Sequence, residues 1–176
     1  VIVTAHPDIR DVNPMPALNK ASPEYTLLYR ILHEIGAICV LSESPGVAMQ
    51  NRGVAILPAV KCAPADATKI RDEHIKACLP WLGRQIGLVK PKIIVGLGSV
   101  ALAALSGAPL SKCHVTRALG AFIPAPIPDT FMIFTVSPAY VIHRKHQNGG
   151  QARDMLKTVL LTAWRKFQDL RRPTED

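Results

Sequence analysis

The stretch from Lys61 to Gly107 decides the fold, and it reads KCAPADATKIRDEHIKACLPWLGRQIGLVKPKIIVGLGSVALAALSG. Its run from Ile93 to Gly98 is apolar, rich in β-branched residues and without alternation, as expected of a parallel strand covered on both faces. Ser99 is a good N-cap and predicts a helix from Val100 to Leu105, which Gly107 ends. A strand that leads through a glycine turn into a helix is the unit of wound α/β sheets.

The rest of the chain continues this alternation of strands and helices. Further strands are predicted at 1–3, 37–41, 54–60 and 131–136, and helices at 23–35, at 72–89 with an interruption at Pro80, and at 151–170. Proline, glycine and polar residues predict loops at 9–21, 42–53 and 143–150, and residues 108–130 are rich in proline. The pattern predicts a three-layer α/β/α sandwich with a central, mostly parallel sheet, as a single domain over residues 1–176. The chain starts inside the first strand and without a methionine, which is typical of a domain trimmed at its amino end.

Composition and charge indicate a soluble globular protein with an anionic partner. Hydrophobic residues make up 48% of the chain and charged residues 19%. No apolar run approaches the roughly 20 residues that span a bilayer, and no signal peptide opens the chain, so we expect a cytoplasmic location without membrane contact. Lys and Arg number 21 against 13 Asp and Glu, a formal net charge of +8. This bias favours a polyanion such as nucleic acid, although solubility alone would also account for it.

Several motifs carry a family resemblance. Residues 60–64 (VKCAP), 77–82 (ACLPWL) and 91–101 resemble the family 4 uracil-DNA glycosylase runs V-K-C-R-P, A-C-x-P-x-L and P-x-x-V-V-x-L-G-x-x-A, with the same cysteine separation. Residues 31–36, 115–120 and 135–139 are similar to the family's first helix, its T-R-x-R-G turn and its H-P-A motif. The resemblance implies a fold that grips DNA, kinks it and swings one nucleotide into a pocket.

The resemblance implies four reactive positions, and this chain differs at each. The acid after the first strand, which activates water or steadies the oxocarbenium ion, aligns with Ala5. The amide that reads the uracil edge aligns with Pro58, and the histidine that stabilises the leaving base aligns with Ser137. The aromatic ring that stacks on the base falls near Lys20, where Asn19-Lys20-Ala21 has no ring. We therefore predict that uracil excision is lost or weakened.

Two readings of the same region remain open. His6 together with Asp8 or Asp11 is able to polarise water, which keeps an active glycosylase with altered chemistry as an alternative. In the other reading His6 caps the turn and the aspartates are solvated. Ser137 likewise either contacts a phosphate or base, or caps a turn or helix.

Positively charged residues in the loops around the expected ligand site predict contacts with the DNA backbone, because phosphate binding needs only suitably placed cations. The loop at 143–150 follows the H-P-A position, where the family pushes a side chain into the minor groove; a solvated surface loop is the alternative. The residues expected to contact DNA are Lys61, Lys112, Arg117, His143, Arg144 and Lys145.

The four cysteines, Cys39, Cys62, Cys78 and Cys113, contain no Cys-x-x-Cys pair. The family's [4Fe-4S] cluster is held by four cysteines, and Cys62 and Cys78 match the second pair, whereas the first pair would precede Val1. Two thiolates cannot hold a cubane. We expect no cofactor, and an iron–sulfur cluster only if upstream cysteines exist. Without them, Cys62 and Cys78 are expected to be buried remnants of the cluster site. Cys39 and Cys113 are expected to be ordinary buried residues.

Together these observations predict a DNA-binding domain of the uracil-DNA glycosylase superfamily, a pseudoenzyme that acts in DNA replication or repair. Its expected partners are single- or double-stranded DNA and a DNA polymerase or other replication protein, in a nucleoid or viral replication complex, by analogy with relatives attached to phage polymerases. Two alternatives stay open: an active glycosylase for uracil or another damaged base, and a protein-interaction scaffold that does not bind DNA.

Overall fold

The computed structural model of the chain describes residues 1–7, 22–40, 49–62, 70–144 and 149–171. Within these residues no helix is long and apolar enough to cross a membrane. The elements, in chain order and with η for a short 3-10 helix, are β1 (Ile2–Thr4), α1 (Pro23–Glu34), β2 (Ile38–Val40), β3 (Met49–Asn51), β4 (Ile56–Pro58), α2 (Asp72–Val89), β5 (Ile93–Leu97), α3 (Gly98–Ser106), η3 (Leu110–Lys112), η4 (Val115–Arg117), β6 (Ile123–Pro124), β7 (Phe131–Thr135), α4 (Pro138–His143) and α5 (Gly149–Arg171).

The central sheet has five strands in the order β4-β1-β5-β7-β6. β1 runs parallel to β4 and to β5, and β5 runs parallel to β7, while β6 pairs with β7 in the antiparallel sense. The register places Thr4 opposite Pro58 and Leu97 opposite Thr135. The predicted mostly parallel sheet is therefore confirmed.

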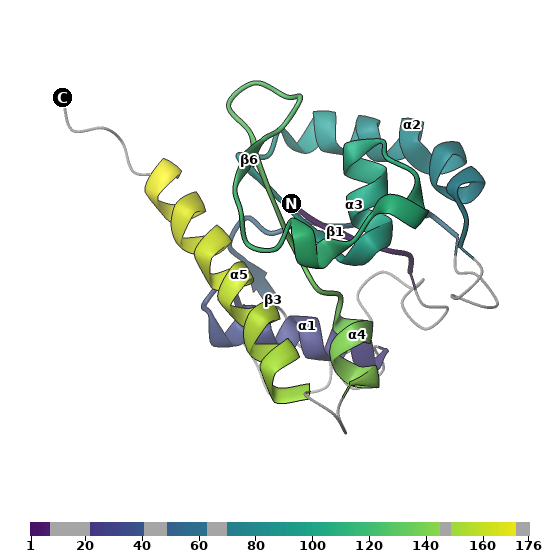
Figure 1. Cartoon of the computed structure of the whole chain (residues 1–176). Coiled ribbons are helices and arrows are strands. Elements are labelled where there is room, and N and C mark those ends of the chain that lie inside the picture. Colours follow the sequence, from purple (N-terminus) through teal and green to yellow (C-terminus); the bar gives the residue numbers. More distant parts are fainter. Residues whose placement is uncertain (8–21, 41–48, 63–69, 145–148, 172–176) are drawn as a thin grey trace.

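Helices cover both faces of this sheet, which confirms the three-layer α/β/α architecture. In Figure 1, α2 and α3 lie on one side of the sheet, and α1, α4 and α5 lie on the other. Alternate strand residues point into the two cores: Ile2, Ile93 and Ile133 pack with α1, α4 and α5, whereas Val3 and Ile94 pack with α2 and α3. This alternation explains why the strands read as continuous apolar runs.

A close contact between the two central strands requires a glycine. A Cβ added to Gly96 of β5 would lie 2.5 Å from the Cδ1 atom of Phe134 on β7. Phe134 is 1% exposed, so its ring has no room to move away. The glycine therefore lets a large aromatic side chain lie flat against the middle of the sheet.

The first two helices follow their sequence signals, with one difference. Ser22 caps α1, because its Oγ accepts a hydrogen bond from the Tyr25 amide at 3.3 Å, and Pro23 occupies the first helical position. α2 spans the predicted range and continues through Pro80, where the sequence predicts a bend or a restart, so the helix does not restart at this residue. Buried residues before and after the proline anchor both halves of the helix to the same core, and this packing outweighs the backbone hydrogen bond that proline cannot donate. These residues are Ile75, Leu82 and Ile86.

The predicted N-cap of α3 is also wrong. The helix begins directly after β5, with Leu97 as the capping residue, and Ser99 lies inside the first turn. Gly98 has φ +84, and this left-handed conformation turns the chain from strand to helix without a loop. Gly107 ends the helix in the left-handed conformation, as predicted.

A small separate ribbon replaces part of a predicted loop. β2 forms as predicted, but it pairs antiparallel with β3 in a two-stranded sheet and does not join the central sheet. Residues 49–51 are therefore a strand, although the sequence pattern predicts a loop at 42–53. A nearby antiparallel partner needs a short connection, whereas joining a parallel sheet needs a crossover.

The predicted basic loop at 143–150 is shorter than expected. α4 extends through His143, and α5 begins at Gly149, so both glycines of the motif lie in a helix. Positions 145–148 lie outside the described residues. The final helix itself is confirmed, since Gly149–Arg171 includes the predicted range 151–170.

Candidate functional site

The carboxyl ends of the four parallel strands meet at one edge of the sheet, where open α/β sheets place their ligand sites. The residues that follow these ends include Ala5 after β1, Ala59 after β4, Gly98 after β5 and Ser137 after β7. We refer to this region as the carboxyl edge. Three of the positions singled out in the sequence, Ala5, Pro58 and Ser137, are brought together here.

Ala5 and Pro58 lie on neighbouring strands, and backbone hydrogen bonds hold them there. The Ala59 amide donates to the Thr4 carbonyl at 2.8 Å, and the Val60 amide donates to the Ala5 carbonyl at 2.9 Å. The ladder between β1 and β4 thus continues past both strand ends. Ala5 offers a methyl group and Pro58 an apolar ring, so neither side chain can donate or accept a hydrogen bond.

Ser137 caps a helix. Its Oγ accepts a hydrogen bond from the Tyr140 amide at 3.2 Å, which starts α4, with Pro138 at the first helical position. Its side chain also lies against Gly98, where an added Cβ would lie 3.0 Å from the Ser137 Cβ. Of the two readings of Ser137, the structure shows the capping role.

His6 lies just after β1 and is half-buried. Its Nδ1 is 3.0 Å from the Pro7 carbonyl oxygen. A carbonyl oxygen can only accept, so this hydrogen bond needs the proton on Nδ1 and leaves Nε2 as the acceptor of the ring. Asp8 and Asp11, the predicted partners of His6, lie outside the described residues.

Buried hydroxyl groups near the carboxyl edge were not found from the sequence. Thr4 Oγ1 and Tyr25 Oη are 3.2 Å apart and join the end of β1 to α1. Thr135, the last residue of β7, is fully buried, and its Oγ1 has no hydrogen-bond partner among the described residues. The sequence did offer a signal for Thr135, because it is a polar residue at the end of an otherwise apolar strand. A hydroxyl group in that position faces either the ligand site or the core.

Lys61 joins β4 to α2. Its ammonium donates to the Pro58 carbonyl at 2.6 Å and to Gln85 Oε1 at 2.5 Å, and its backbone amide donates to the Cys78 Sγ at 3.4 Å. Burial lowers the pKa of Lys61, and the charge interaction with Cys78 acts in the opposite direction. The predicted contact of Lys61 with DNA remains a prediction, and the structure gives its ammonium two partners within the protein.

The cysteines do not assemble into a metal centre within the described part of the chain. Cys62 is exposed, so its prediction as a buried residue is wrong, whereas Cys78 is half-buried and Cys113 is buried as expected. The side chain of Cys39 lies outside the described residues. No group of three or more His, Cys, Asp or Glu side chains in the described ranges could hold a metal ion. A cubane needs four thiolates, so these residues do not fit the family's cluster.

The predicted cations lie on several elements around the carboxyl edge. Lys112 and Arg117 are exposed on η3 and η4, and His143 and Arg144 are exposed at the end of α4. The Leu110 amide of η3 donates to Asp72 Oδ1 at 2.7 Å, and the Gly120 amide after η4 donates to the Phe134 carbonyl at 3.0 Å, which ties both turns to the rim. The guanidinium of Arg144 lies 5.3 Å from the ring centre of Tyr140.

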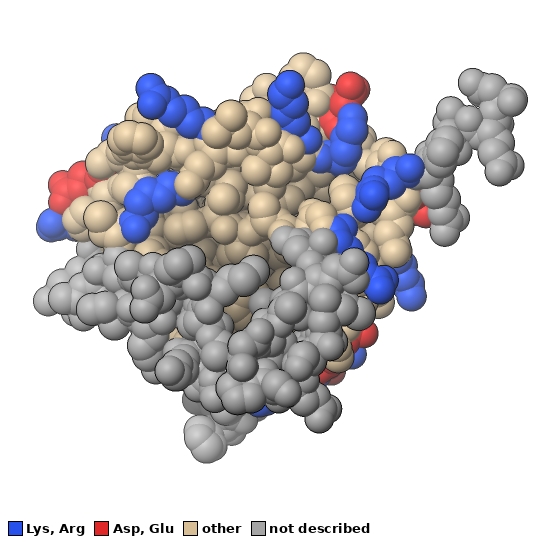
Figure 2. All heavy atoms as spheres, turned by 180° about the vertical axis from the view of Figure 1, so that it is seen from behind, with Lys and Arg blue, Asp and Glu red and all other residues tan. Residues whose placement is uncertain are grey.

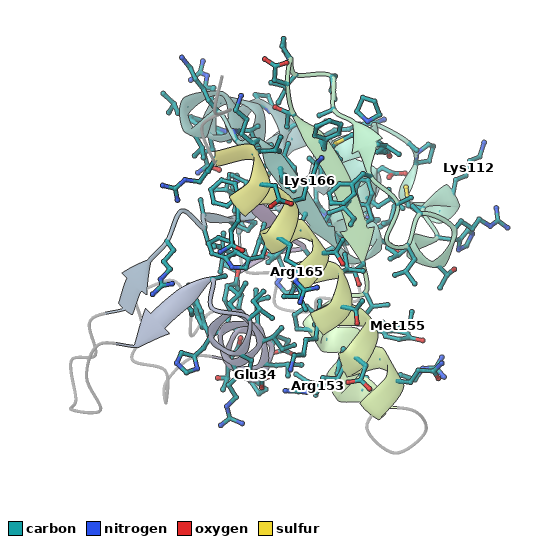
Figure 3. The ribbon with its side chains drawn as sticks, turned by 90° about the vertical axis from the view of Figure 1, so that its left-hand side faces the viewer. Glu34, Lys112, Arg153, Met155, Arg165 and Lys166 are labelled. Carbon is teal, nitrogen blue, oxygen red and sulfur yellow. The ribbon has the colours of Figure 1, made fainter. Side chains whose placement is uncertain are left out.

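Seen from behind, the described surface carries scattered Lys and Arg side chains, and Asp and Glu lie toward its outline (Figure 2). Lys112 points away from the sheet on a different side from Arg165 and Lys166 of α5 (Figure 3). The positive charge is therefore distributed over more than one face. Lys145 and Lys20, also predicted to lie at the site, are outside the described residues.

The chain matches the family model of the uracil DNA glycosylase superfamily over residues 19–168. It is 31% identical over 140 residues to the type-5 uracil-DNA glycosylase of Thermus thermophilus, which covers 78% of this chain and 62% of that protein. It is 30% identical over 112 residues to the type-4 uracil-DNA glycosylase of Pyrobaculum aerophilum, which covers 58% of this chain and 54% of that protein. The match thus spans less than two thirds of the length of either relative. With the family model covering most of its length, the chain belongs to the uracil DNA glycosylase superfamily.

Proposed function

We propose that this domain binds DNA at the carboxyl edge of its sheet, and that its uracil excision is lost or much weaker than in an active glycosylase. The observation that carries the proposal is the edge formed by Ala5, Pro58 and Ser137, which supplies a methyl group, an apolar ring and a hydroxyl that caps a helix. None of these groups can activate water as a carboxylate does, or read a uracil edge as an amide does.

Membership in the superfamily and the names of the relatives support DNA as the substrate class. The exposed cations Lys112, Arg117 and Arg144 around the edge, and the net charge of +8, suit phosphate contacts. In this proposal the domain serves DNA replication or repair, beside a polymerase or another replication protein.

An excision assay tests the lost activity. Single- and double-stranded oligonucleotides with one uracil are incubated with the protein, and abasic sites are detected by cleavage in alkali. The type-5 enzyme of Thermus thermophilus is the positive control. We expect turnover at least about 10²-fold below this control, because removal of one charge-stabilising donor alone costs about 10²–10³ in rate. Robust turnover by the unaltered chain would overturn the proposal.

Fluorescence anisotropy at several salt concentrations tests the DNA binding. We expect binding that weakens steeply as salt rises, and Lys112→Ala and Arg117→Ala should each reduce the slope of log K against log salt by about 1. Arg165→Ala on α5 is the matched control, since this arginine is exposed but lies away from Lys112 (Figure 3). Undetectable affinity at low salt would favour a protein-interaction scaffold instead.

One observation favours a second candidate, an active glycosylase with an altered catalytic set. His6 lies at the end of β1, and its Nε2 is left as an acceptor that can take a proton from water. In this case His6→Ala abolishes turnover, and Asp8→Asn or Asp11→Asn reduces it if either carboxylate orients the ring. An unchanged rate in His6→Ala would remove this candidate.

A further inference from the structure

A cavity of about 410 Å³ lies at the edge of the sheet opposite to the carboxyl edge. Its lining includes the segments that lead into three neighbouring strands, which are residues 53–55 before β4, 1–2 at the start of β1 and 91–93 at the start of β5. Residues of α1 and α5 close it on the face of the sheet that these helices cover. We call it the amino-edge cavity.

The walls of the amino-edge cavity belong to the core beneath α1 and α5. Leu32 and Leu160 are buried in this core, and Ile35, Trp164 and Phe167 are partly buried against it. The ring centres of Trp164 and Phe167 are 5.4 Å apart. Because packed core residues form them, these walls keep their shape without a ligand, as the walls of small-molecule sites usually do.

The polar side chains that line the cavity are all hydrogen-bond donors. Among the lining residues that the structure describes, those with a nitrogen or oxygen atom in the side chain are Lys90, Lys92 and Trp164. An ammonium group and an indole N–H can donate a hydrogen bond but cannot accept one. The polar end of a matching ligand is therefore an acceptor, and two ammonium groups favour an acceptor with a negative charge.

Positive charge is available at the amino-edge cavity. Lys90 and Lys92 are exposed and form no ion pair within the described part of the chain. The guanidinium of Arg171 lies 5.5 Å from the ring centre of Phe167, which lines the cavity. These cations complement an anionic group whose apolar body occupies the cavity.

Three acidic residues lie near the lining residues in the sequence or in the sheet, and none of them lines the cavity. Glu34 is paired with two cations of α5. Asp169 lies about 200° around α5 from Phe167, on the other side of the helix. Asp129 precedes β7, which lies on the side of β5 away from β1. The charge at the cavity itself therefore stays positive.

Lys90 has an unusual backbone conformation. It ends α2 with φ 48 and ψ 58, in the left-handed region where glycine is the usual residue because other side chains are strained there. A lysine at this end of a helix also complements the helix dipole. A strained, charged residue that lines a cavity indicates a role in binding as well, and Lys90→Gly separates the two roles.

We propose that the amino-edge cavity binds a small organic carboxylate, whose apolar body lies between the sheet, α1 and α5 and whose carboxylate accepts hydrogen bonds from Lys90 and Lys92. The cavity volume is near the lower end of the range of about 300–1,000 Å³ that is typical of ligand pockets, which favours a small ligand. A nucleobase fits poorly, because its N–H donors would find no acceptor among the lining side chains. The site is separate from the carboxyl edge, so the inference does not depend on uracil excision.

Trp164 provides the readout, because Trp81→Phe leaves it as the single tryptophan of the chain. Octanoate, and 1-octanol as its neutral analogue, are titrated against this variant, and the change in tryptophan fluorescence gives each Kd. We expect both ligands to change the emission of Trp164. Adding Lys90→Gly and Lys92→Gln should weaken octanoate binding about tenfold, through the loss of two partly screened ion pairs, and leave 1-octanol binding within about twofold.

Lys76→Gln is the matched control, at an exposed position of α2 that does not line the cavity, and it should leave octanoate binding unchanged. Ala163→Leu fills part of the cavity from α5 and should weaken the binding of both ligands. Thermal unfolding of each variant shows whether the fold is intact. Lys90→Gly should not lower the midpoint, because glycine adopts the left-handed conformation without strain.

The absence of a fluorescence change with octanoate in the millimolar range overturns the proposal. An equal loss of octanoate and 1-octanol binding in the lysine variant also overturns it, as does octanoate binding that this variant leaves unchanged. If Ala163→Leu does not fold, the lysine variant decides alone. Quenching by a single-stranded oligonucleotide that the lysine variant abolishes, without binding of octanoate, overturns the proposal in favour of nucleic acid.

Discussion

Gly98 and Ser137 touch where β5 and β7 end: a Cβ built on Gly98 would lie 3.0 Å from the Cβ of Ser137 and 3.4 Å from its Oγ. Gly98 also has φ +84, a conformation that alanine adopts at a cost. We expect Gly98→Ala to lower the free energy of unfolding by about 1–3 kcal/mol, from backbone strain and the contact with Ser137. Urea denaturation measures the change.

Gly87→Ala on α2 is the matched control for this prediction. Gly87 lies inside the helix, and a Cβ there would meet no atom within 4 Å. Alanine should raise the free energy of unfolding by roughly 0.5–1 kcal/mol, because it restricts the unfolded chain without strain in the helix. Equal effects of the two substitutions would contradict the role of the Gly98 conformation.

Lys61 is expected to stabilise the corner between β4 and α2. Lys61→Met removes the hydrogen bonds to the Pro58 carbonyl and to Gln85, and the carbonyl is left without this donor. We expect a loss of about 1–2 kcal/mol in the free energy of unfolding. Lys76→Met, at an exposed position of the same helix, should change it by less than about 0.5 kcal/mol. Thermal unfolding of the unaltered chain, Lys61→Met and Lys76→Met at one pH compares their free energies of unfolding.

The buried hydroxyl of Thr135 should cost stability. Its Oγ1 has no hydrogen-bond partner among the described residues, and the side chain is fully buried. Thr135→Val keeps the shape and replaces the hydroxyl by a methyl group, so the free energy of unfolding should rise by about 1 kcal/mol. The measurement is the urea midpoint at an unchanged m-value. A lower midpoint would mean that the hydroxyl is paired in solution.

An ion-pair cluster between α1 and α5 predicts a dependence of stability on pH. Arg153 Nη2 donates to Glu34 Oε1 at 2.6 Å, and Lys157 Nζ lies 2.9 Å from Glu34 Oε2. Figure 3 shows Glu34 and Arg153 side by side between the two helices. The hydrogen bond from Lys157 is the largest cause that lowers the pKa of Glu34 from its usual 4.5, with smaller contributions from both cations.

A carboxyl group with a lowered pKa in the folded state stabilises the fold above its unfolded pKa, and this contribution is lost as pH falls through the lower, folded value. Chemical unfolding of the chain and of Glu34→Gln between pH 7 and pH 2 should therefore give a difference that is present near neutral pH and disappears below 4.5. The difference should be small, because the side chains are about a third exposed. A difference that grows toward acid pH would contradict this assignment.

Local signals predicted most of the elements. The run Ser22-Pro23-Glu24 marked the start of α1, and the apolar run at 93–97 became β5 with every residue buried. Capping, helical spacing and β-branched runs act within a few residues of each other, so they can be read along the chain. The absence of a restart at Pro80 and the start of α3 before Ser99 have one cause: contacts with other elements decide whether a helix continues or where it begins.

The candidate site was partly predictable. Motif alignment found Ala5, Pro58 and Ser137, because each follows a strand that the sequence shows clearly. It could not show that Lys61 turns its ammonium to Pro58 and Gln85, or that Cys62 is exposed. Side-chain direction depends on the packing of distant segments, which spacing along the chain does not report.

By itself the sequence determined the superfamily, the alternation of strands and helices, and the chemical identity of the groups at each strand end. The tertiary structure decided which strands are neighbours, that β2 and β3 form a ribbon apart from the main sheet, and that Ser137 is engaged as a helix cap. It also decided that Trp81 and Leu88 of an otherwise well-packed helix face outward. Local propensities are properties of short segments, whereas burial and neighbour contacts exist only once distant segments pack together.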